Sequence, residues 1–353
     1  MSSSTSELQS DANVNVTHEW VLGPEDTPFY TLRWSPASEK PKAYILFIHG
    51  FSEHIARYDS LFRRLASAPY YLHITAFDQR GHGRTSHAPL SAESPEVKEW
   101  KAQGKAVTIG KSTKRKTGGW AKVLPDIEWF VIREQEYIKQ QGGGGKLFLW
   151  GFSMGGGQVL AFVTRPQKPP SEETVAFLSG LIAGGPMIRQ TTPASVLQLK
   201  VGSIAASIGL GNMLIPAPVG WDFLSQNKES NERAKNDPFC EPVGSLRGLA
   251  DMLNGGASLD SQSAYNHFPS DLPLLVYHGG GDKICDPAAA RRFAEGAAAK
   301  DKTFKEFPGA YHEVHNELEP TPSELASLVG NWVLTRVDGL GAEERGQSQQ
   351  SKL

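Results

Sequence analysis

The chain has 353 residues, of which 39% are hydrophobic and 21% are charged, so it can bury a sizeable core. The net charge of −2 creates no field that would attract nucleic acid, and we expect no nucleic-acid partner. Two cysteines without a metal-binding spacing exclude a disulfide scaffold, and we expect neither a metal nor a cofactor. The N-terminus lacks the basic region followed by an apolar region that marks a signal peptide, so we expect none. No run of 18 apolar residues occurs in the sequence, so we expect no membrane-spanning helix.

Eight runs of residues predict β-strands, and most of them alternate with helical patterns. The predicted strands are 15–22, 28–34, 43–49, 72–77, 146–150, 176–183, 273–278 and 303–307. Helical spacing occurs at 58–67, 120–141, 155–164 and 287–299. This alternation predicts an α/β fold, with a mostly parallel eight-stranded sheet that carries helices on both faces.

The composition divides the chain into a core, an insertion and two tails. The polar ends, 1–13 and 339–353, are predicted to be disordered. The core is expected in two parts, 14–185 and 269–338. The stretch between them, 186–268, is expected to form a cap or lid inserted between the fifth and sixth parallel strands. Such a cap would cover the edge of the sheet where ligands bind in this class of fold.

Residues 151–155 match the pattern Gly-x-Ser-x-Gly, with the strand-like KLFLW before it and GGGQVLAFVT after it. A strand that turns abruptly into a helix exposes the serine at the turn, and the flanking glycines let neighbouring backbone pass close by. This context predicts that Ser153 is a nucleophile. The alternative is a glycine-rich turn that merely buries a serine.

A serine hydroxyl needs a base that takes its proton, and in this fold class the acid and then the histidine follow the serine along the chain. His312, in the loop after the last strand, is the predicted base, and His315 is its competitor. His278 lies inside a strand and is better explained as a packed core histidine. Asp282, directly after three glycines, is the predicted acid. Asp286 better fits the N-cap of the next helix, because a proline follows it.

An oxyanion formed at the attacked carbonyl needs backbone N–H donors. One donor comes from the residue after the nucleophile, which is Met154. The other comes from a loop after an early strand, and Phe51 is the candidate because it follows the apolar run 43–49 and a glycine.

The chain resembles the monoacylglycerol lipases of the serine α/β-hydrolase family in six segments. These are IHGFSEHIARY (48–58), FDQRGHGRTS (77–86), GFSMGGG (151–157), LSQNKESNERAKNDPFC (224–240), HGGGDKICD (278–286) and PGAYHEVHNE (308–317). The resemblance spans about 20–335. It implies cleavage of a monoacylglycerol to glycerol and a fatty acid through an acyl-enzyme on Ser153, without cofactor or metal.

Carried over by position, the resemblance gives the same triad and the same two oxyanion donors. It also implies that Glu53, Arg57 and His315 shape the polar pocket for the glycerol end of the substrate. The chain departs from the family at Ser52, where many members have glycine.

Two features suggest contact with lipid surfaces. One face of a predicted helix in the cap carries Leu197, Val201, Ile204 and Ile208. This face either packs on the domain or forms an apolar lip that enters a lipid surface. The basic stretch 97–117 either lies near anionic lipid or is a solvated loop. We therefore expect peripheral association with a membrane or lipid droplet. The alternative is that the helix face packs on the domain and the basic stretch is a solvated loop.

The last three residues, Ser351-Lys352-Leu353, match an address for the peroxisomal import receptor. We expect a peroxisomal location, with the lipid droplet or the cytoplasm as alternatives. Competing functions that use the same triad are a lysophospholipase, a thioesterase, a serine aminopeptidase or another carboxylesterase. A catalytically silent binding module is the alternative outside enzymes.

Overall fold

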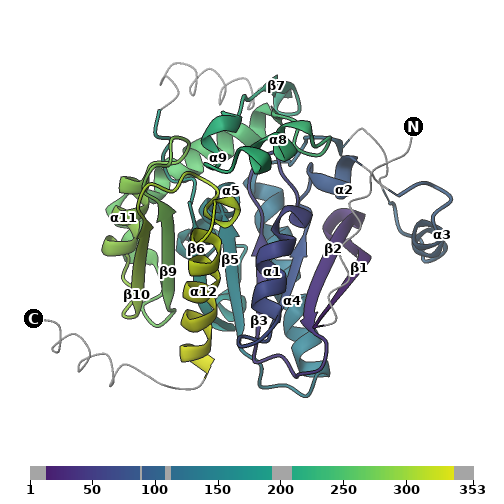
Figure 1. The fold of residues 1–353 in the computed structure, drawn as a ribbon. Coiled ribbons are helices and arrows are strands. Elements are labelled where there is room, and N and C mark those ends of the chain that lie inside the picture. Colours follow the sequence, from purple (N-terminus) through teal and green to yellow (C-terminus); the bar gives the residue numbers. More distant parts are fainter. Residues whose placement is uncertain (1–12, 88–89, 108–112, 193–208, 338–353) are drawn as a thin grey trace, which may run out of the picture.

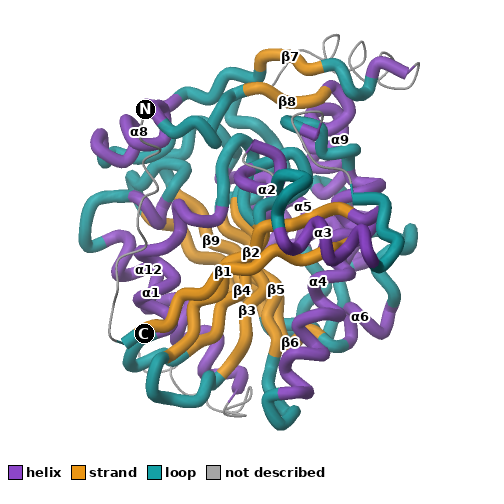
Figure 2. Tube along the Cα trace, turned by 90° about the vertical axis from the view of Figure 1, so that its right-hand side faces the viewer, coloured by secondary structure: helices purple, strands orange, loops and turns teal. Residues whose placement is uncertain are grey.

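One eight-stranded sheet organises the protein, with the strand order β1-β2-β4-β3-β5-β6-β9-β10 (Figure 1). The structure is a computed structural model that describes residues 13–87, 90–107, 113–192 and 209–337. The strands of this sheet are β1 (Val14–Gly23), β2 (Thr27–Pro36), β3 (Ala43–Ile48), β4 (Leu72–Phe77), β5 (Leu147–Phe152), β6 (Leu178–Gly184), β9 (Leu274–Gly279) and β10 (Lys302–Phe307). Strands β3 to β10 of the sheet pair in parallel, whereas β2 pairs antiparallel with both β1 and β4. The predicted fold class is confirmed, and Figure 2 shows the twist of the sheet.

The position of the predicted cap in the strand count was wrong. The insertion separates β6 from β9, which are the fourth and fifth parallel strands in chain order and not the fifth and sixth. The reason is that β2 runs antiparallel to its neighbour β4, so the parallel series begins only at β3.

Helices cover both faces of the sheet. They are α1 (Asp59–Ala66), α2 (Gly83–His87), α3 (Pro95–Ala102), α4 (Trp120–Gln140), α5 (Met154–Thr164), α6 (Glu172–Ala176), α8 (Lys228–Asn236), α9 (Leu246–Leu259), α10 (Gln262–His267), α11 (Pro287–Gly296) and α12 (Thr321–Val337). Apolar side chains of α1 and α12 pack on one face, and those of α4, α5 and α11 pack on the other. This arrangement buries the middle of the sheet on both sides.

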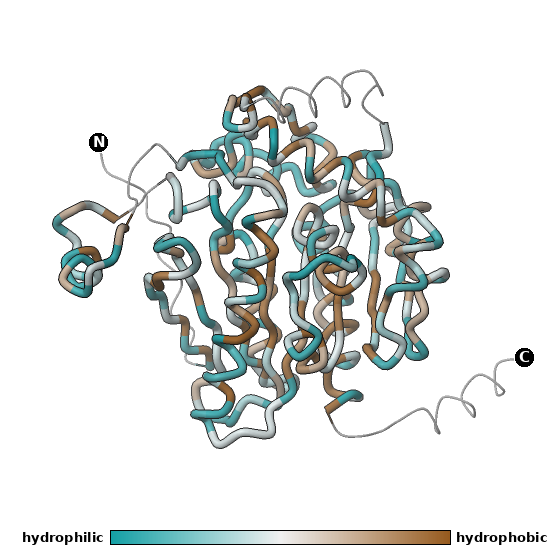
Figure 3. The backbone as a smooth tube through the Cα atoms, turned by 180° about the vertical axis from the view of Figure 1, so that it is seen from behind, coloured by the Kyte–Doolittle hydropathy of each residue, from teal (hydrophilic) through white to brown (hydrophobic). Residues whose placement is uncertain are grey.

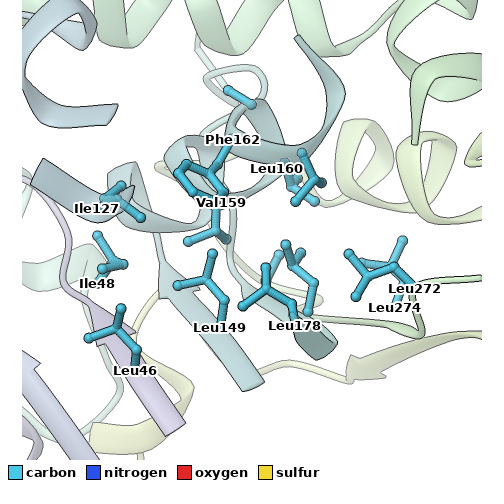
Figure 4. Packing of buried hydrophobic residues seen from close by; sticks show 14 of the residues in the cluster. Leu46, Ile48, Ile127, Leu149, Val159, Leu160, Phe162, Leu178, Leu272 and Leu274 are labelled. Carbon is cyan, nitrogen blue, oxygen red and sulfur yellow. The ribbon is translucent and has the colours of Figure 1, made fainter. Parts of the chain in front are cut away.

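The run of apolar residues in β3 follows from this double burial. Ile45 and Phe47 point into the cluster with α1 and α12, while Leu46 and Ile48 point into the cluster with α4 and α5 (Figure 4). A strand buried on both faces needs apolar residues at every position. Figure 3 shows hydrophobic colour running through the middle of the molecule. The result is a rigid platform for the loops at its carboxyl edge.

The described part of the insertion lies above this edge (Figure 1). It contains α8, α9, α10 and a small antiparallel pair, β7 (Leu214–Pro216) with β8 (Val243–Ser245). Helix α9 packs against α5, which directly follows the predicted nucleophile. The predicted amphipathic face, Leu197 to Ile208, lies outside the described residues, as do the two predicted tails except for Asn13.

The basic stretch 97–117 is only partly available to a lipid surface. Its first residues lie in α3 and in the turn that follows, where the side chains of Lys98, Lys101 and Lys105 are exposed. Arg115, in contrast, is buried and donates a hydrogen bond to the carbonyl oxygen of Phe239 at 3.0 Å. Within the described residues, no helix combines the length and the apolar character needed to cross a bilayer.

Candidate active site

Three loops at the carboxyl edge of the sheet bring Ser153, Asp282 and His312 together. Ser153 follows β5, Asp282 lies in the loop after β9, and His312 lies in the loop after β10. Since β5, β6, β9 and β10 are successive parallel neighbours, the loops that follow them meet on one side of the sheet. Residues that are 159 positions apart in the sequence therefore come into contact.

Ser153 occupies a strained turn between β5 and α5. Its backbone has φ 54° and ψ −118°, a conformation that a residue with a side chain rarely adopts. A Cβ atom at Gly155 would clash with the carbonyl oxygen of Ile48, and one at Gly151 would clash with the carbonyl oxygen of Gly155. The two glycines of the motif are thus required by the close packing of the turn.

The side chains form a continuous hydrogen-bonded chain. Nε2 of His312 lies 2.9 Å from the hydroxyl oxygen of Ser153, and Nδ1 of His312 lies 2.7 Å from Oδ2 of Asp282. With the proton on Nδ1, the ring donates to Asp282 and its Nε2 accepts the serine proton. All three residues are buried. The geometry required of a nucleophile, a base and an orienting acid is therefore present.

The pKa values of Asp282 and His312 are shifted in the direction that catalysis needs. Burial alone would raise the pKa of Asp282, but the neighbouring His312 and hydrogen bonds from His278 and His312 hold that pKa below its usual range. Burial alone would lower the pKa of His312, but the Asp282 carboxylate raises it above the ordinary value of 6.5. The carboxylate is therefore ionised and favours a positive charge on the imidazole.

Both predicted oxyanion donors lie beside Ser153. Met154 is the first residue of α5, so its N–H has no acceptor within the helix. Gly50 approaches so closely that a Cβ atom there would lie 3.0 Å from the Cβ of Ser153. Phe51 follows Gly50 and lines the adjacent cavity. The placement fits the predicted roles of the Phe51 and Met154 N–H groups, which stay predictions.

A cavity of about 750 Å³ opens at the nucleophile. Much of its wall is apolar and comes from the insertion, including α9: Ile215, Pro216, Ala217, Pro218, Val219, Phe223, Leu224, Leu246, Leu249, Ala250, Met252 and Leu253. Ser153 and His312 lie on the wall. Two acidic residues, Glu53 and Glu313, and the basic residue Lys283 also line the cavity. The cavity thus joins an apolar region to a small polar region at the nucleophile.

A buried ion network stands behind the polar region. Arg57 donates to both oxygens of Glu313, at 2.7 and 2.8 Å, and to Oε2 of Glu53 at 3.2 Å. Glu53 also accepts hydrogen bonds from the Gly50 N–H and from the Tyr58 hydroxyl. Although burial opposes ionisation, Arg57 lowers the pKa of Glu313 to about 2. Arg57 therefore keeps Glu313 ionised, whereas burial raises the pKa of Glu53 although Arg57 opposes this shift.

The three residues assigned to the glycerol pocket differ in their access to the cavity. Glu53 lines it, whereas Arg57 and His315 are not among the described residues that do. The ring of His315 stacks on Tyr58 with a centroid distance of 4.5 Å and meets Phe152 edge to face. Contact between substrate and Glu53 stays a prediction, and the other two residues are placed to support that side chain.

Two residues of the site were missed by the sequence analysis. Glu313 lines the cavity directly after His312, and this adjacency was the signal that could have found it. His278 was taken as a packed core histidine. It is fully buried, but its Nε2 lies 2.9 Å from Oδ2 of Asp282. The separation of four residues between His278 and Asp282 gave no sign of this contact.

Two further interpretations can be compared with the structure. Asp286 is the N-cap of α11, as predicted, and accepts a hydrogen bond from the Ala288 N–H at 2.9 Å. Ser52, at the position where relatives often have glycine, has φ 58° and donates from its hydroxyl to the carbonyl oxygen of Glu241 at 2.6 Å. A positive φ favours glycine, the residue that the resemblance implies at this position.

Clusters of metal-ligating residue types have other partners. His54 and Asp237, which lie near Cys240, form a hydrogen bond of 2.9 Å. The other cluster combines Asp282 and His312 with Cys285, so two of its members belong to the hydrogen-bonded chain. The expectation of a metal-free site stays a prediction.

Comparison with known proteins supports the fold and the chemistry. A family model described as "Serine aminopeptidase, S33" matches residues 39–319. A Schizosaccharomyces pombe relative named "Putative monoglyceride lipase" is 31% identical over 309 residues, which cover 86% of this chain and 70% of the relative. The monoglyceride lipase of Mus musculus is 27% identical over 317 residues, which cover 88% of each protein.

A solved structure shows the same fold. The soluble variant of monoglyceride lipase from Saccharomyces cerevisiae, in complex with a substrate analog, superposes with a TM-score of 0.72. The match covers 94% of this chain and 97% of that chain, at 23% identity. Together with the family match, this similarity confirms the resemblance predicted from the sequence. The chain therefore belongs to the serine aminopeptidase S33 family of α/β-hydrolases, as a relative of monoglyceride lipases.

Proposed function

We propose that the protein hydrolyses monoacylglycerols to glycerol and a fatty acid through an acyl-enzyme on Ser153. The observation that carries this proposal is the hydrogen-bonded chain from Ser153 through His312 to Asp282 at the wall of a largely apolar cavity. The names of the relatives support the choice of substrate.

The geometry supports a two-step acyl transfer. His312 takes the proton of the Ser153 hydroxyl while the oxygen attacks the ester carbonyl, and Asp282 stabilises the imidazolium that forms. The N–H groups of Phe51 and Met154 stabilise the oxyanion. His312 then gives its proton to the leaving glycerol oxygen. In the second step, water attacks the acyl-enzyme with the same base and releases the fatty acid.

The two regions of the cavity suit the two ends of the substrate. The apolar wall that the insertion contributes, α9 included, accommodates the acyl chain. The carboxylates of Glu53 and Glu313 can accept hydrogen bonds from the free hydroxyls of the glycerol end. A monoacylglycerol needs both regions, whereas a simple activated ester needs only the first.

The test is hydrolysis by the purified protein of monoacyl-, diacyl- and triacylglycerols, a lysophospholipid, an acyl thioester and a peptide amide that share one acyl chain where the chemistry allows. We expect monoacylglycerol to have the highest kcat/KM, and S153A to lose about 10⁶-fold in kcat. S258A, which alters an exposed serine on α9, is the matched control and should keep full activity. Preference for another substrate would replace the proposal, and near-native hydrolysis by S153A would remove the nucleophile.

A second comparison tests the glycerol pocket. Glu53→Ala should raise KM for monoacylglycerol more than KM for a p-nitrophenyl ester of the same fatty acid. The activated ester controls for a general disturbance of the loop that carries Glu53. Equal effects on both substrates would contradict a role of Glu53 in binding glycerol.

Association with a lipid surface and import into the peroxisome belong to this proposal as expectations. The exposed side chains of Lys98, Lys101 and Lys105 support an approach to anionic lipid, and flotation with anionic vesicles tests it. The C-terminal motif Ser351-Lys352-Leu353 lies outside the described residues. Its deletion should return a tagged protein from the peroxisome to the cytosol, and an unchanged distribution would contradict that location.

A further inference from the structure

The carboxylate of Asp282 receives four hydrogen bonds. Its Oδ1 accepts the backbone N–H groups of Ile284 and Cys285, at 2.7 and 3.0 Å. Its Oδ2 is shared by two histidines, with Nδ1 of His312 at 2.7 Å and Nε2 of His278 at 2.9 Å. The contact from His278 has no place in the mechanism above.

The surroundings of His278 define which nitrogen carries its proton. The side chain is fully buried, and its Nε2 faces only acceptors, namely Oδ2 of Asp282 and the Cys285 carbonyl oxygen at 3.2 Å. Its Nδ1 has no hydrogen-bond partner among the described residues. A charged ring would bury an unpaired N–H, which is costly. The neutral ring with the proton on Nε2 satisfies the contacts best.

His278 belongs to the strand β9, whereas Asp282 belongs to the loop that follows it. In the sheet, His278 pairs with Glu306 of β10, so its backbone is fixed on the rigid platform. A donor held by a strand can fix the rotamer of a carboxylate carried by a loop. The same donor also takes part of the acceptor strength of Oδ2, which would otherwise act on His312 alone.

We propose that His278 is a positioning residue, which donates from Nε2 to Oδ2 of Asp282 and thereby sets both the orientation of that carboxylate and its hold on His312. This proposal rests on the proposed use of the triad, but it requires no particular substrate. It predicts two consequences when the donor is removed. The carboxylate loses its alignment, which lowers kcat, and its undivided acceptor strength stabilises protonated His312.

The pH dependence of His312 must be judged against all its titratable neighbours. The groups that influence its charge are Asp282, Glu313 and Glu53, and His315 and Cys285 also lie close enough to interact with it. The planned substitutions leave these five residues unchanged. A shift of the acid limb of the pH profile can therefore be assigned to the contact between His278 and Asp282.

The experiment compares H278F, which cannot donate, with H278Q, whose amide nitrogen can take the place of Nε2. Both are assayed with a p-nitrophenyl ester, so that a failure of monoacylglycerol as substrate does not affect the result. We expect H278F to lose about tenfold or more in kcat, with the acid limb of kcat/KM moved to higher pH. H278Q should retain activity within about threefold and keep the acid limb in place.

A purely structural role would lower the folded fraction, measured by circular dichroism and active-site titration, without moving the acid limb. Folded H278F with the kcat and the acid limb of the unaltered enzyme would overturn the proposal. Nitrogen NMR of the unaltered enzyme, labelled at histidine and assigned with H278Q, provides a test that needs no folded H278F. We expect a proton on Nε2 and none on Nδ1 of His278. The opposite tautomer would overturn the proposal.

Discussion

Asp282→Asn changes the acid while preserving its shape. In the structure, the carboxylate accepts from four donors, two backbone N–H groups on Oδ1 and two histidine nitrogens on Oδ2. An amide has one oxygen and one NH₂ group, so it cannot accept on both sides. If its oxygen keeps the Ile284 and Cys285 N–H groups, its nitrogen faces His312 as a donor.

The size of the expected loss in kcat follows from the tautomer of His312. A donor opposite Nδ1 favours the ring with the bare nitrogen at Nδ1 and the proton at Nε2. That ring cannot accept the proton of Ser153, whose hydroxyl oxygen lies 2.9 Å from Nε2. The loss of this function in a triad costs about 10⁴-fold in kcat, or about 5 kcal/mol. If the amide turned around, two buried backbone N–H groups would lose their acceptor, which costs about 1–3 kcal/mol each in stability.

The assay is steady-state hydrolysis of a p-nitrophenyl ester across pH, with circular dichroism to confirm the fold. Asp286→Asn is the matched control, because Asp286 is an N-cap and asparagine caps helices about as well as aspartate. We expect the control to keep its kcat. A folded Asp282→Asn variant within tenfold of the unaltered enzyme would refute the assignment of the acid, and loss of activity in the control would transfer that role to Asp286.

Three further predictions concern the same site. Because His312 must be neutral to accept a proton and its pKa is raised by Asp282, kcat/KM should fall as pH decreases through a value above 6.5; an acid limb below 6.5 would contradict this. Arg57→Met leaves Glu53 and Glu313 buried without their cation, so the free energy of unfolding should fall by about 3–5 kcal/mol. Denaturant titration measures this loss, and an unchanged midpoint would contradict the stabilising role of the ion network. Gly50→Ala places a Cβ against the buried Glu53 carboxylate beside the nucleophile. In the folded protein kcat should fall by about 10²-fold, and the melting temperature should fall as well because Glu53 must move, whereas an unchanged kcat would show that the loop has room.

The sheet was predictable because its strands carry an unusually clear signal. Residues such as Ile45 and Leu46 point to opposite faces, and both faces are buried, so the whole strand is apolar. The turn at Ser153 was predictable for a related reason, since only glycine tolerates the close backbone contacts around it. The count of parallel strands before the insertion was not predictable, because the direction of β2 depends on its pairing with β4.

The contacts of the site were less accessible to sequence reasoning. The order of serine, acid and histidine along the chain predicted which three side chains would come together, without any knowledge of distances. The role of His278 depends on how the loop after β9 turns back toward the strand, which no spacing rule describes. In the same way, the sequence motifs could not show that Glu53 and Glu313 line the cavity whereas Arg57 lies behind them and binds both carboxylates.

The central claim is that an otherwise unreactive hydroxyl is activated by a histidine and an aspartate from distant loops. A fluorophosphonate tests it most directly, because it reacts covalently with an activated serine and its position can be mapped by mass spectrometry of the digested protein. We predict one adduct per chain, on Ser153, and strongly slowed labelling when His312 is replaced by alanine. An adduct on another serine, or equally fast labelling without His312, would contradict the account.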